Sequence, residues 1–251
     1  MKFNVVIPAR IASTRLPNKP LADIHGIPMV VRVAQQAARS DAHEVVVATD
    51  DERIVKVVEA AGMTAVLTRE DHPSGSDRVK EVADLRGWVA DDIVINVQGD
   101  EPLVPPEVIV QVAESLQADG SLAAATLCEP ITDYQTVFDP NAVKVVFAND
   151  GRALYFSRAP IPYARDHFAG QNTLPDGSDW WRHIGVYAYR VWALEKFVSL
   201  SPGRLEQLES LEQLRLLENG LDIRVEEACA PVPGGVDTPE DLERVRAQLA
   251  G

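Results

Sequence analysis

Residues 3–20 read FNVVIPARIASTRLPNKP, an apolar run that passes directly into a basic loop. The run Phe3–Ile7 is short and rich in β-branched residues, as buried strands are, and Pro8 ends it. Ligands of open α/β sheets bind beyond the carboxyl ends of the parallel strands. The loop after this strand, residues 8–20 and called the basic loop below, is therefore the first candidate for a functional site.

The following hundred residues alternate between strand and helix patterns. Helical spacing of apolar residues predicts helices, and short apolar runs between them predict further buried strands. The expected strands are 44–48, 64–67, 93–97 and 122–127, and the expected helices are 29–39, 52–61, 76–85 and 107–116. A capping box of Thr49 and Glu52 is expected to open the second of these helices. This alternation predicts an α/β fold with a mostly parallel sheet and helices on both faces.

After about residue 130 the pattern becomes richer in turns. Strands are expected at 143–147, 153–156 and 184–189, with a hairpin turn at Asn149-Asp150-Gly151 between the first two. The irregular segment 160–179 predicts an arm or lid. A helix at 205–217, a strand at 223–226 and a helix at 240–249 complete the expected elements. We expect a single domain, 1–251, that carries an inserted smaller sheet or arm.

Composition and charge limit the classes of function. The net charge of −14 argues against a general nucleic-acid binder, which needs a broad basic face. Residues 1–22 nevertheless contain Lys2, Arg10, Arg15 and Lys19 and no acidic residue. This local excess of positive charge favours a focused site for a small polyanion, with a solvated basic loop as the alternative.

The apolar runs are short, and the cysteines are few. No stretch reaches the roughly 20 apolar residues of a membrane span, and 3–7 is too short for the core of a signal peptide. Cys128 and Cys229 have no partner at metal-binding spacing, and both lie in apolar stretches typical of buried thiols. The sequence leaves open whether the two cysteines form a disulfide. These features predict a protein of the cytoplasm with no membrane segment and no zinc site.

The basic loop has the chemistry of a phosphate site. Arg10 and Arg15 present forked donors, Lys19 adds a point charge, and Ser13 and Thr14 add hydroxyl groups. Backbone amides in such a turn can also cradle phosphate oxygens. The loop lacks the glycines of a Walker motif and of the G-x-G-x-x-G motif, so neither of those nucleotide sites is indicated.

Together with Leu21, Ile24, Gly26 and Pro28-Met29, the basic loop closely resembles the start of the sugar-acid cytidylyltransferases, and within them the 3-deoxy-manno-octulosonate cytidylyltransferases, or CMP-Kdo synthetases. The resemblance continues in order along nearly the whole chain. Its further motifs are Val47–Asp50, Asn96–Pro102, Asn141–Val146, Tyr155–Arg158, His183–Tyr187 and Gly235–Asp241. It implies a nucleotide-diphospho-sugar transferase fold (glycosyltransferase A-like) and a homodimer.

The resemblance also implies an activity. CMP would pass from CTP to the anomeric hydroxyl of 3-deoxy-D-manno-octulosonate (Kdo), giving CMP-Kdo and diphosphate for lipopolysaccharide biosynthesis. Mg²⁺ is the implied cofactor, and CTP and Kdo are the implied small-molecule substrates. Residues 1–128 would then form the nucleotide-binding part, and residues 129–251 the sugar-binding and dimerisation part.

By the same resemblance, individual residues receive roles. The catalytic set is Arg15, Lys19, Asp100 and Asp237, of which Asp100 and Asp237 would bind the metal. The CTP-binding set is Pro8, Ala9, Arg10, Arg15, Lys19, Ser74, Ser76, Gln98 and Asp100. The sugar-binding set is Gln98, Arg158, His183, Tyr187, Glu212 and Gln213. This chain has Ser76 and Asp77 where the family more often has threonine and glutamate.

Structural roles remain open for several of these residues. Asp237 precedes an ordinary helix start, with Thr238 at the N-cap and Pro239 at the first helical position. The serines near residue 75 can be helix caps, His183 can be a structural histidine in a strand, and Glu212 and Gln213 can lie on the solvated face of a helix. Trp180 and Trp181 are expected to pack or to contact a second subunit.

Two further functions compete with Kdo activation. One is the same reaction with another acid sugar, such as an acylneuraminate or an amino-substituted Kdo. The other is a glycosyltransferase on a similar fold, which would carry an Asp-x-Asp metal motif. Gln98-Gly99-Asp100 lacks the first carboxylate of that motif. A nucleotide-binding protein without catalysis is a third and weaker option.

Overall fold

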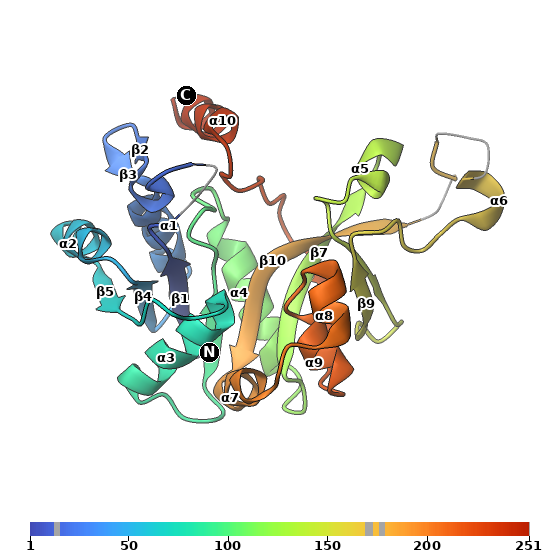
Figure 1. The fold of residues 1–251 in the computed structure, drawn as a ribbon, viewed down its shortest axis with the longest axis horizontal. Helices are drawn as coiled ribbons and strands as arrows, with labels where there is room; N and C mark the ends of the chain where they lie inside the picture. The colour runs from blue at the N-terminus through green and yellow to red at the C-terminus, as the bar shows by residue number, and fades with distance from the viewer. Residues whose placement is uncertain (13–15, 169–172, 176–178, 251) are drawn as a thin grey trace.

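The computed structural model describes residues 1–12, 16–168, 173–175 and 179–250. Within these residues nine strands form one sheet, with the order β11-β7-β10-β6-β1-β4-β5 along its main path (Figure 1). The strands of the main path are β1 (Phe3–Ala9), β4 (Glu44–Thr49), β5 (Thr64–Leu67), β6 (Ile93–Asn96), β7 (Ala124–Ile131), β10 (Trp180–Arg190) and β11 (Ile223–Glu227). Each expected strand is present, and several extend by one or more residues. However, β7 begins two residues later than expected, the strand expected at 143–147 begins one residue later, and β6 ends one residue earlier.

The sheet is mostly parallel, as the sequence predicts. β1 pairs in parallel with both β4 and β6, and β4 pairs in parallel with β5. β10 alone runs against its neighbours β6 and β7 along this path, and β7 pairs in parallel with β11. A second, two-stranded sheet joins β2 (Asp23–Ile24) to β3 (Ile27–Pro28).

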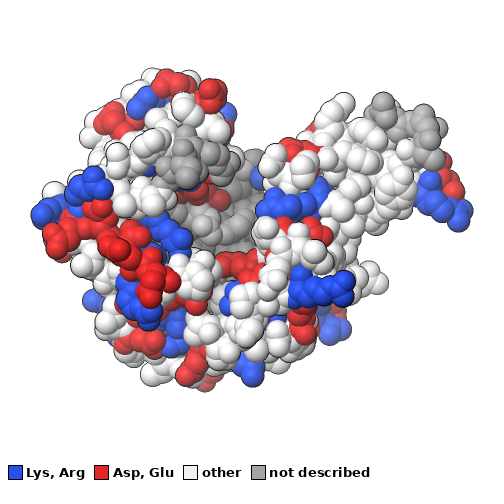
Figure 2. All heavy atoms as spheres, viewed as in Figure 1, with Lys and Arg blue, Asp and Glu red and all other residues white. Residues whose placement is uncertain are grey.

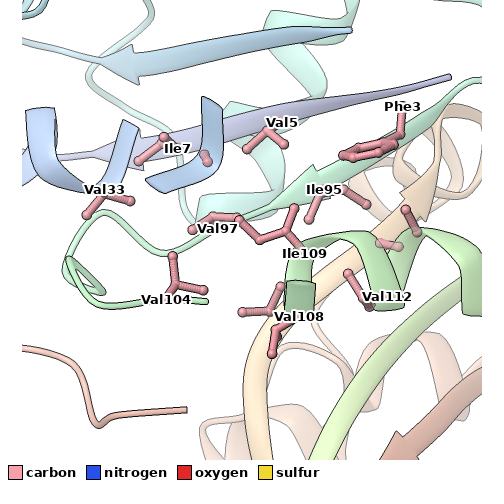
Figure 3. Packing of buried hydrophobic residues seen from close by; sticks show 14 of the residues in the cluster. Phe3, Val5, Ile7, Val33, Ile95, Val97, Val104, Val108, Ile109 and Val112 are labelled. Carbon is pink, nitrogen blue, oxygen red and sulfur yellow. The ribbon is translucent and has the colours of Figure 1, made fainter. Parts of the chain in front are cut away.

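Helices cover both faces of the sheet, as expected. One face packs against α1 (Met29–Ala38), α2 (Glu52–Ala60) and α4 (Pro106–Gln117), and the other against α3 (Gly75–Arg86), α7 (Val191–Ser199) and α9 (Leu214–Glu218). The alternation of β1 explains this division, since Phe3, Val5 and Ile7 enter the first core while Val6 enters the second. Figure 3 shows the first core, where β1 meets Ile95 and the side chains of α4.

An arm projects from this body (Figure 1). It consists of α5 (Tyr134–Phe138), the hairpin of β8 (Lys144–Phe147) and β9 (Ala153–Ser157), and α6 (Arg165–Phe168). The arm has a small core of its own that includes Val137, Phe168 and the expected packing residue Trp180. The predicted hairpin turn is confirmed, with Gly151 at a φ of 82°. The expected arm is present, but its strands are not a separate sheet: β8 pairs with both β9 and β10, so the hairpin is a branch of the main sheet.

The C-terminal helix α10 (Pro239–Leu249) returns to the N-terminal part of the chain. Val236, Leu242 and Val245 pack with Ile24 and Met29 in a third core. Beside this core, the short 3-10 helix η1 (Lys19–Leu21) ends the basic loop. Packing between the two ends of the chain therefore brings the segment before α10 next to Lys19.

Three local expectations are wrong. The helix expected at 205–217 is two helices, α8 (Arg204–Glu209) and α9, because Ser210 ends α8 in the left-handed conformation with a φ of 52°. Asp51 caps α2 in place of the expected capping box, and Thr49 stays in β4. Cys229 is exposed, whereas Cys128 is buried, and both thiols are free.

No helix in the described part of the chain has the length and apolar character needed to cross a bilayer.

Candidate active site

A pocket of about 410 Å³ lies at the carboxyl end of β1. The end of this strand and the loop after β6 form its floor, and the basic loop and the segment before α10 form its walls. Its lining includes Pro8, Ala9, Arg10, Lys19, Gly75, Gln98, Gly99, Asp100 and Asp237. The predicted position beyond the carboxyl ends of the strands is therefore where the structure brings most of the expected nucleotide-site residues together.

Lys19 lies between two carboxylates in this pocket. Its Nζ is 2.6 Å from Asp100 Oδ2 and 3.1 Å from Asp237 Oδ1. Burial alone would lower the pKa of Lys19, but the two carboxylates outweigh it and raise the pKa above its ordinary value. The ammonium therefore stays charged, and it offsets the repulsion between two negative groups that the fold holds close together.

Backbone contacts explain how Asp100 and Asp237 come together. The Val236 amide donates to the Asp100 carbonyl at 2.8 Å. A Cβ on Gly235 would lie 3.2 Å from that same carbonyl oxygen, which is tighter than ordinary contact. The absence of a side chain at Gly235 thus lets the segment before α10 lie against the loop that carries Asp100.

Gly99 allows a second close approach. A Cβ on Gly99 would lie 2.6 Å from the Pro8 carbonyl oxygen, a distance at which the backbone would have to shift. The loop after β6 therefore packs directly on the end of β1. This contact fixes the position of Gln98 and Asp100 relative to the end of β1.

The alternative capping role of Asp237 is excluded by the start of α10. Thr238 is the N-cap, its side chain accepts from the Asp241 amide, and the Asp241 side chain accepts from the backbone in return. Asp237 stands one residue before this capping box, with its carboxylate turned to Lys19. Thr238 thus caps the helix, and the Asp237 carboxylate contacts Lys19 in the lining of the pocket.

The two carboxylates fit Mg²⁺ as a donor set. The side chains of Asp100 and Asp237 are 29% and 47% exposed, so each can act as a ligand to a cation in the pocket. In the described ranges, no group of three or more His, Cys, Asp or Glu side chains is arranged to hold a metal. Mg²⁺ prefers such an incomplete protein set, with one or two carboxylates and the remaining ligands from water and phosphate. A cation already bridges the pair, since the Lys19 ammonium contacts both carboxylates.

A second pocket of about 570 Å³ adjoins the first. Arg10, Gly75 and Gln98 line both pockets, so the two form one continuous cleft. The second pocket is closed by the start of α3 and by α8 with the segment after it, and its lining includes Ser74, Glu206, Ser210, Glu212 and Arg215. Figure 2 shows the hollowed face between the N-terminal part and the arm, with acidic and basic side chains around it.

The start of α3 carries both expected serines, of which Ser74 alone lines the second pocket. Ser74 is the N-cap of α3, which confirms the alternative role of a helix cap, and it also lines the pocket. Ser76 is buried and donates to Glu212 Oε1 at 2.9 Å. Burial raises the pKa of Glu212, and the Ser76 hydroxyl partly offsets that shift. Neighbouring Gln213 is buried, and its Nε2 has no hydrogen-bond partner within the described residues.

His183 and Tyr187 lie on β10 at an irregularity in the strand. The pairing of β10 with β7 shifts register between Ile184 and Tyr187. Residues four apart in a regular strand are separated by about 13 Å, but the rings of His183 and Tyr187 are 5.3 Å apart between their centroids. Gln98 Nε2 is 3.4 Å from the Gly185 carbonyl in this irregular segment, which connects it to the cleft.

The environment of His183 sets its charge and tautomer. Burial, with a smaller effect of Arg182, lowers the pKa of His183 to about 3, so the ring is neutral at neutral pH. Thr126 Oγ1 lies 3.1 Å from His183 Nε2 and 2.9 Å from the carbonyls of Ile184 and Val186. The hydroxyl has one hydrogen to donate to a carbonyl, so it accepts from His183, which places the ring proton on Nε2.

Arg158 is held by backbone carbonyls. Its Nε donates to the Glu209 carbonyl at 2.7 Å and its Nη1 to the Pro140 carbonyl at 2.9 Å. The Arg158 guanidinium thus fixes the end of α8, whose following residue Ser210 lines the second pocket. Of the described residues expected to bind sugar, Arg158, His183, Tyr187 and Gln213 lie outside the linings of both pockets, whereas Gln98 and Glu212 line the cleft.

Arg215 and Thr126 join the residues that the sequence predicts for the site. Arg15, with Ser13 and Thr14, lies outside the described residues. Arg215 lines the second pocket and was not expected there; its Nε and Nη2 pair with Glu206, with Nη2 2.5 Å from Oε1. Thr126 was also missed, because a threonine in an apolar strand has no pattern that marks it. The alternation of buried and exposed positions gives no such signal either.

The parallel sheet, the basic loop at its carboxyl edge and the paired carboxylates together define a nucleotidyltransferase-type α/β enzyme. The family model described as Cytidylyltransferase matches residues 4–223. The chain therefore belongs to the cytidylyltransferase family.

The relatives narrow this assignment. A protein of Alcanivorax borkumensis named 3-deoxy-manno-octulosonate cytidylyltransferase is 60% identical, and the match covers all of both chains. One of Cellvibrio japonicus with the same name is 57% identical over 99% of this chain and 98% of its own. Among solved structures, a CMP:2-keto-3-deoxy-manno-octonic acid synthetase complexed with CTP has a TM-score of 0.90 and 44% identity, over 100% of this chain and 99% of that one.

A more distant structure supports the fold alone. A cytidylyltransferase from Leptospira borgpetersenii has a TM-score of 0.64 at 17% identity. It covers 100% of this chain and 87% of that chain.

Proposed function

We propose that this enzyme transfers CMP from CTP to the anomeric hydroxyl of Kdo and releases diphosphate. The names of the full-length relatives and the CTP complex of the similar structure support this assignment. The product, CMP-Kdo, would supply lipopolysaccharide biosynthesis. The observation that carries the proposal is the position of Lys19, between Asp100 and Asp237, in a pocket that opens into a second one.

The cleft offers one compartment for each substrate. We assign the first pocket to CTP, with Arg10 and Lys19 facing the triphosphate and Pro8 and Ala9 beside the base or ribose. We assign the second pocket to the acid sugar. Gln98 lines both pockets and would meet both substrates where they react. The expected division of the chain near residue 128 stays a prediction, since Asp237 lines the first pocket and Arg10 and Gln98 line the second.

The chemistry requires charge neutralisation more than covalent help. A bond forms between the anomeric oxygen of the sugar and the α-phosphorus, and the bond from that phosphorus to the bridging oxygen breaks. Diphosphate leaves with the electron pair, and the hydroxyl proton is released. Positive groups fixed where the leaving diphosphate gains charge stabilise the transition state. Lys19 and Arg10 supply that charge, and we assign Arg15 to the same role by family resemblance.

We propose Mg²⁺ as the cofactor, held by Asp100 and Asp237. Its chemistry when bound would be charge neutralisation of the phosphate oxygens. The supporting observation is that both carboxylates are partly exposed and that both contact the same Lys19 ammonium. Lys19 would then remain beside the phosphates and donate to them, since its Nζ carries three hydrogens.

Hydrogen-bonding side chains suit the hydroxyls of the sugar. His183 is neutral and has a defined tautomer, so it presents an acceptor at Nδ1. Tyr187, beside it, and Glu212 and Gln213, beyond Ser76, complete the proposed set of sugar contacts with Gln98. For Arg158 we propose a positioning role through the end of α8 in addition to the expected contact with the sugar carboxylate.

An assay with a panel of substrates tests this function. Diphosphate release is measured with CTP and, in turn, Kdo, an amino-substituted Kdo and N-acetylneuraminate. The proposal expects the highest kcat/KM with Kdo, and CTP preferred over UTP and ATP. A higher kcat/KM for another acid sugar would reassign the substrate and keep the reaction. Transfer from a finished nucleotide sugar to an acceptor, without use of CTP, would favour the glycosyltransferase alternative.

The homodimer and the cytoplasmic location stay predictions. Sedimentation of the purified chain tests the first, and fractionation of cells tests the second. Nucleic acid is not an expected partner, given the net charge of −14.

A further inference from the structure

Arg78 is a buried arginine in the helix that begins at the nucleotide pocket. It lies in the second turn of α3, whose first residue, Gly75, lines that pocket. Its side chain is 0% exposed, and it is among the largest fully buried side chains of the described residues. A guanidinium is rarely buried without charged or polar partners, because its removal from water is energetically costly.

The Arg78 guanidinium joins two strand ends. Its Nη1 donates to Thr68 Oγ1, just after β5, and its Nη2 lies 3.3 Å from Asp50 Oδ2, just after β4. Thr68 in turn donates from its amide and its hydroxyl to the Thr49 carbonyl, at 2.8 and 3.0 Å. Burial lowers the pKa of Arg78, and the Asp50 carboxylate opposes that shift.

Asp50 extends this contact to the basic loop. Its Oδ1 accepts from the Ile11 amide at 3.4 Å, while its Oδ2 faces Arg78. The Asp50 side chain is itself only 11% exposed, so its negative charge depends on Arg78 for compensation. Ile11 follows Arg10, the arginine that lines both pockets. One carboxylate thus connects a buried cation to the backbone of the phosphate-binding loop.

Arg10 also connects the basic loop to the region of α3. Arg10 donates to the carbonyl of His72, in the segment that leads into α3. Arg10 therefore connects the basic loop to the segment before α3. Asp50 and Arg78 connect the same loop to α3 itself. Two separate contacts with the same helix region fix the first described part of the loop.

From this arrangement we infer that Arg78 and Asp50 are positioning residues for CTP: Arg78 holds the Asp50 carboxylate, which holds the Ile11 amide and so the start of the basic loop. Neither side chain lines the described pockets, so both act through the loop. Since transfer needs the phosphates in one geometry, a looser loop lowers CTP affinity and turnover together. The inference rests on the proposed function for the identity of the nucleotide.

Variants at Asp50 and Arg78 separate positioning from general stability. Asp50→Asn keeps an acceptor for Ile11 and loses the charge that pairs with Arg78. Asp50→Ala loses both. Arg78→Lys keeps a charge that reaches one partner, and Arg78→Met keeps none. Arg53→Met is the matched control, because it removes an exposed arginine from the ion pair with Asp51, next to Asp50.

CTP affinity is measured by calorimetry without sugar, and KM is measured for each substrate. We expect Asp50→Ala to raise the Kd and KM for CTP by about tenfold, in line with the loss of a buried charge-assisted hydrogen bond. The KM for sugar should change less than twofold. Asp50→Asn should lie between Asp50→Ala and the wild type, and Arg78→Lys should partly restore what Arg78→Met loses. Arg53→Met should match the wild type.

Two results would overturn the inference. One is a folded Asp50→Ala enzyme with wild-type affinity for CTP. The other is an equal loss for CTP and sugar that follows the melting temperature, which indicates a structural role only. If Arg78→Met does not fold, the Asp50→Asn measurement decides. Because CTP binding is measured without sugar, a wild-type enzyme inactive on Kdo would contradict the proposed function and leave this test intact.

Discussion

Lys19 Nζ lies 2.6 Å from Asp100 Oδ2, although 81 positions separate the two residues in the chain. The same ammonium contacts Asp237, from the segment before the last helix. Three charged groups from distant parts of the sequence thus meet where β1 and β6 end. A cation fixed there is positioned to stabilise charge on a departing diphosphate.

The first prediction concerns Lys19. Lys19→Met removes the charge and keeps a similar apolar stem. Because the charge matters most in the transition state, we expect kcat to fall by about 10²–10³, equivalent to about 2.7–4 kcal/mol. Binding of CTP should weaken only modestly. Steady-state kinetics with both substrates give this result, and Lys56→Met, at an exposed lysine of α2, is the matched control.

Raised KM for CTP with unchanged kcat would instead show that Lys19 only anchors the substrate. The catalytic charge would then have to come from Arg10, Arg15 and the metal.

The second prediction concerns the carboxylates. Asp100→Asn and Asp237→Asn should each keep the fold, lower turnover strongly and raise the concentration of Mg²⁺ needed for half-maximal rate. Thr238→Ala is the control at the neighbouring cap, and it should cost about 1 kcal/mol of stability without a change in the Mg²⁺ requirement. Magnesium titrations of rate, and thermal melting without metal, distinguish the two effects.

If Asp237→Asn reached wild-type turnover at limiting Mg²⁺ and only lowered the melting temperature, its assignment as a ligand would be wrong. The same outcome for Asp100→Asn would remove the proposed metal site altogether.

The third prediction concerns Gly99. Gly99→Ala places a Cβ only 2.6 Å from the Pro8 carbonyl oxygen, so the loop that carries Gln98 and Asp100 must move. We expect kcat/KM to fall by at least tenfold, since misplacement of a positioning group by about 1 Å can cost 10²-fold. Gly120→Ala is the control, because a Cβ there meets nothing within 4 Å in the described structure. Equal activity of both variants would argue against the close approach.

The fourth prediction concerns pH and His183. Its pKa is about 3 in the folded protein and near the ordinary 6.5 in the unfolded chain. Between these values the unfolded state binds more protons, so the free energy of unfolding falls as the pH falls below 6.5. The contribution is at most about 1.4 kcal/mol per pH unit. Urea unfolding at pH 7.5 and 5.5 should therefore show a shallower loss for His183→Gln than for the wild type, and an identical loss would contradict the shift.

Much of the fold can be predicted from the sequence because its signals are local. The strands at 44–49 and 64–67 are short apolar runs, and helix α2 between them has a clear periodicity. The approach of Asp100 to Lys19 is predictable in outline, since both follow parallel strands that end at the same edge. That Asp237 joins them depended on family resemblance, because a capping motif explains the same residues.

The remainder depends on tertiary contacts. The break between α8 and α9 follows from Ser210 in the left-handed conformation, and the run of leucines across it has helical spacing. Helix α7, which directly follows the buried strand β10, is not among the elements expected from the sequence. The contact of Arg78 with Asp50 spans 28 positions and leaves no trace in spacing.

The most direct test of the central claim is a phosphorus NMR spectrum of the purified enzyme with CTP, Kdo and Mg²⁺. The account predicts that the three CTP signals disappear while equal amounts of diphosphate and of one phosphodiester, CMP-Kdo, form, and that Lys19→Met slows this conversion at saturating CTP. Omission of Kdo should leave CTP intact. Conversion of CTP to free CMP without a phosphodiester, or equal product with N-acetylneuraminate in place of Kdo, would contradict it.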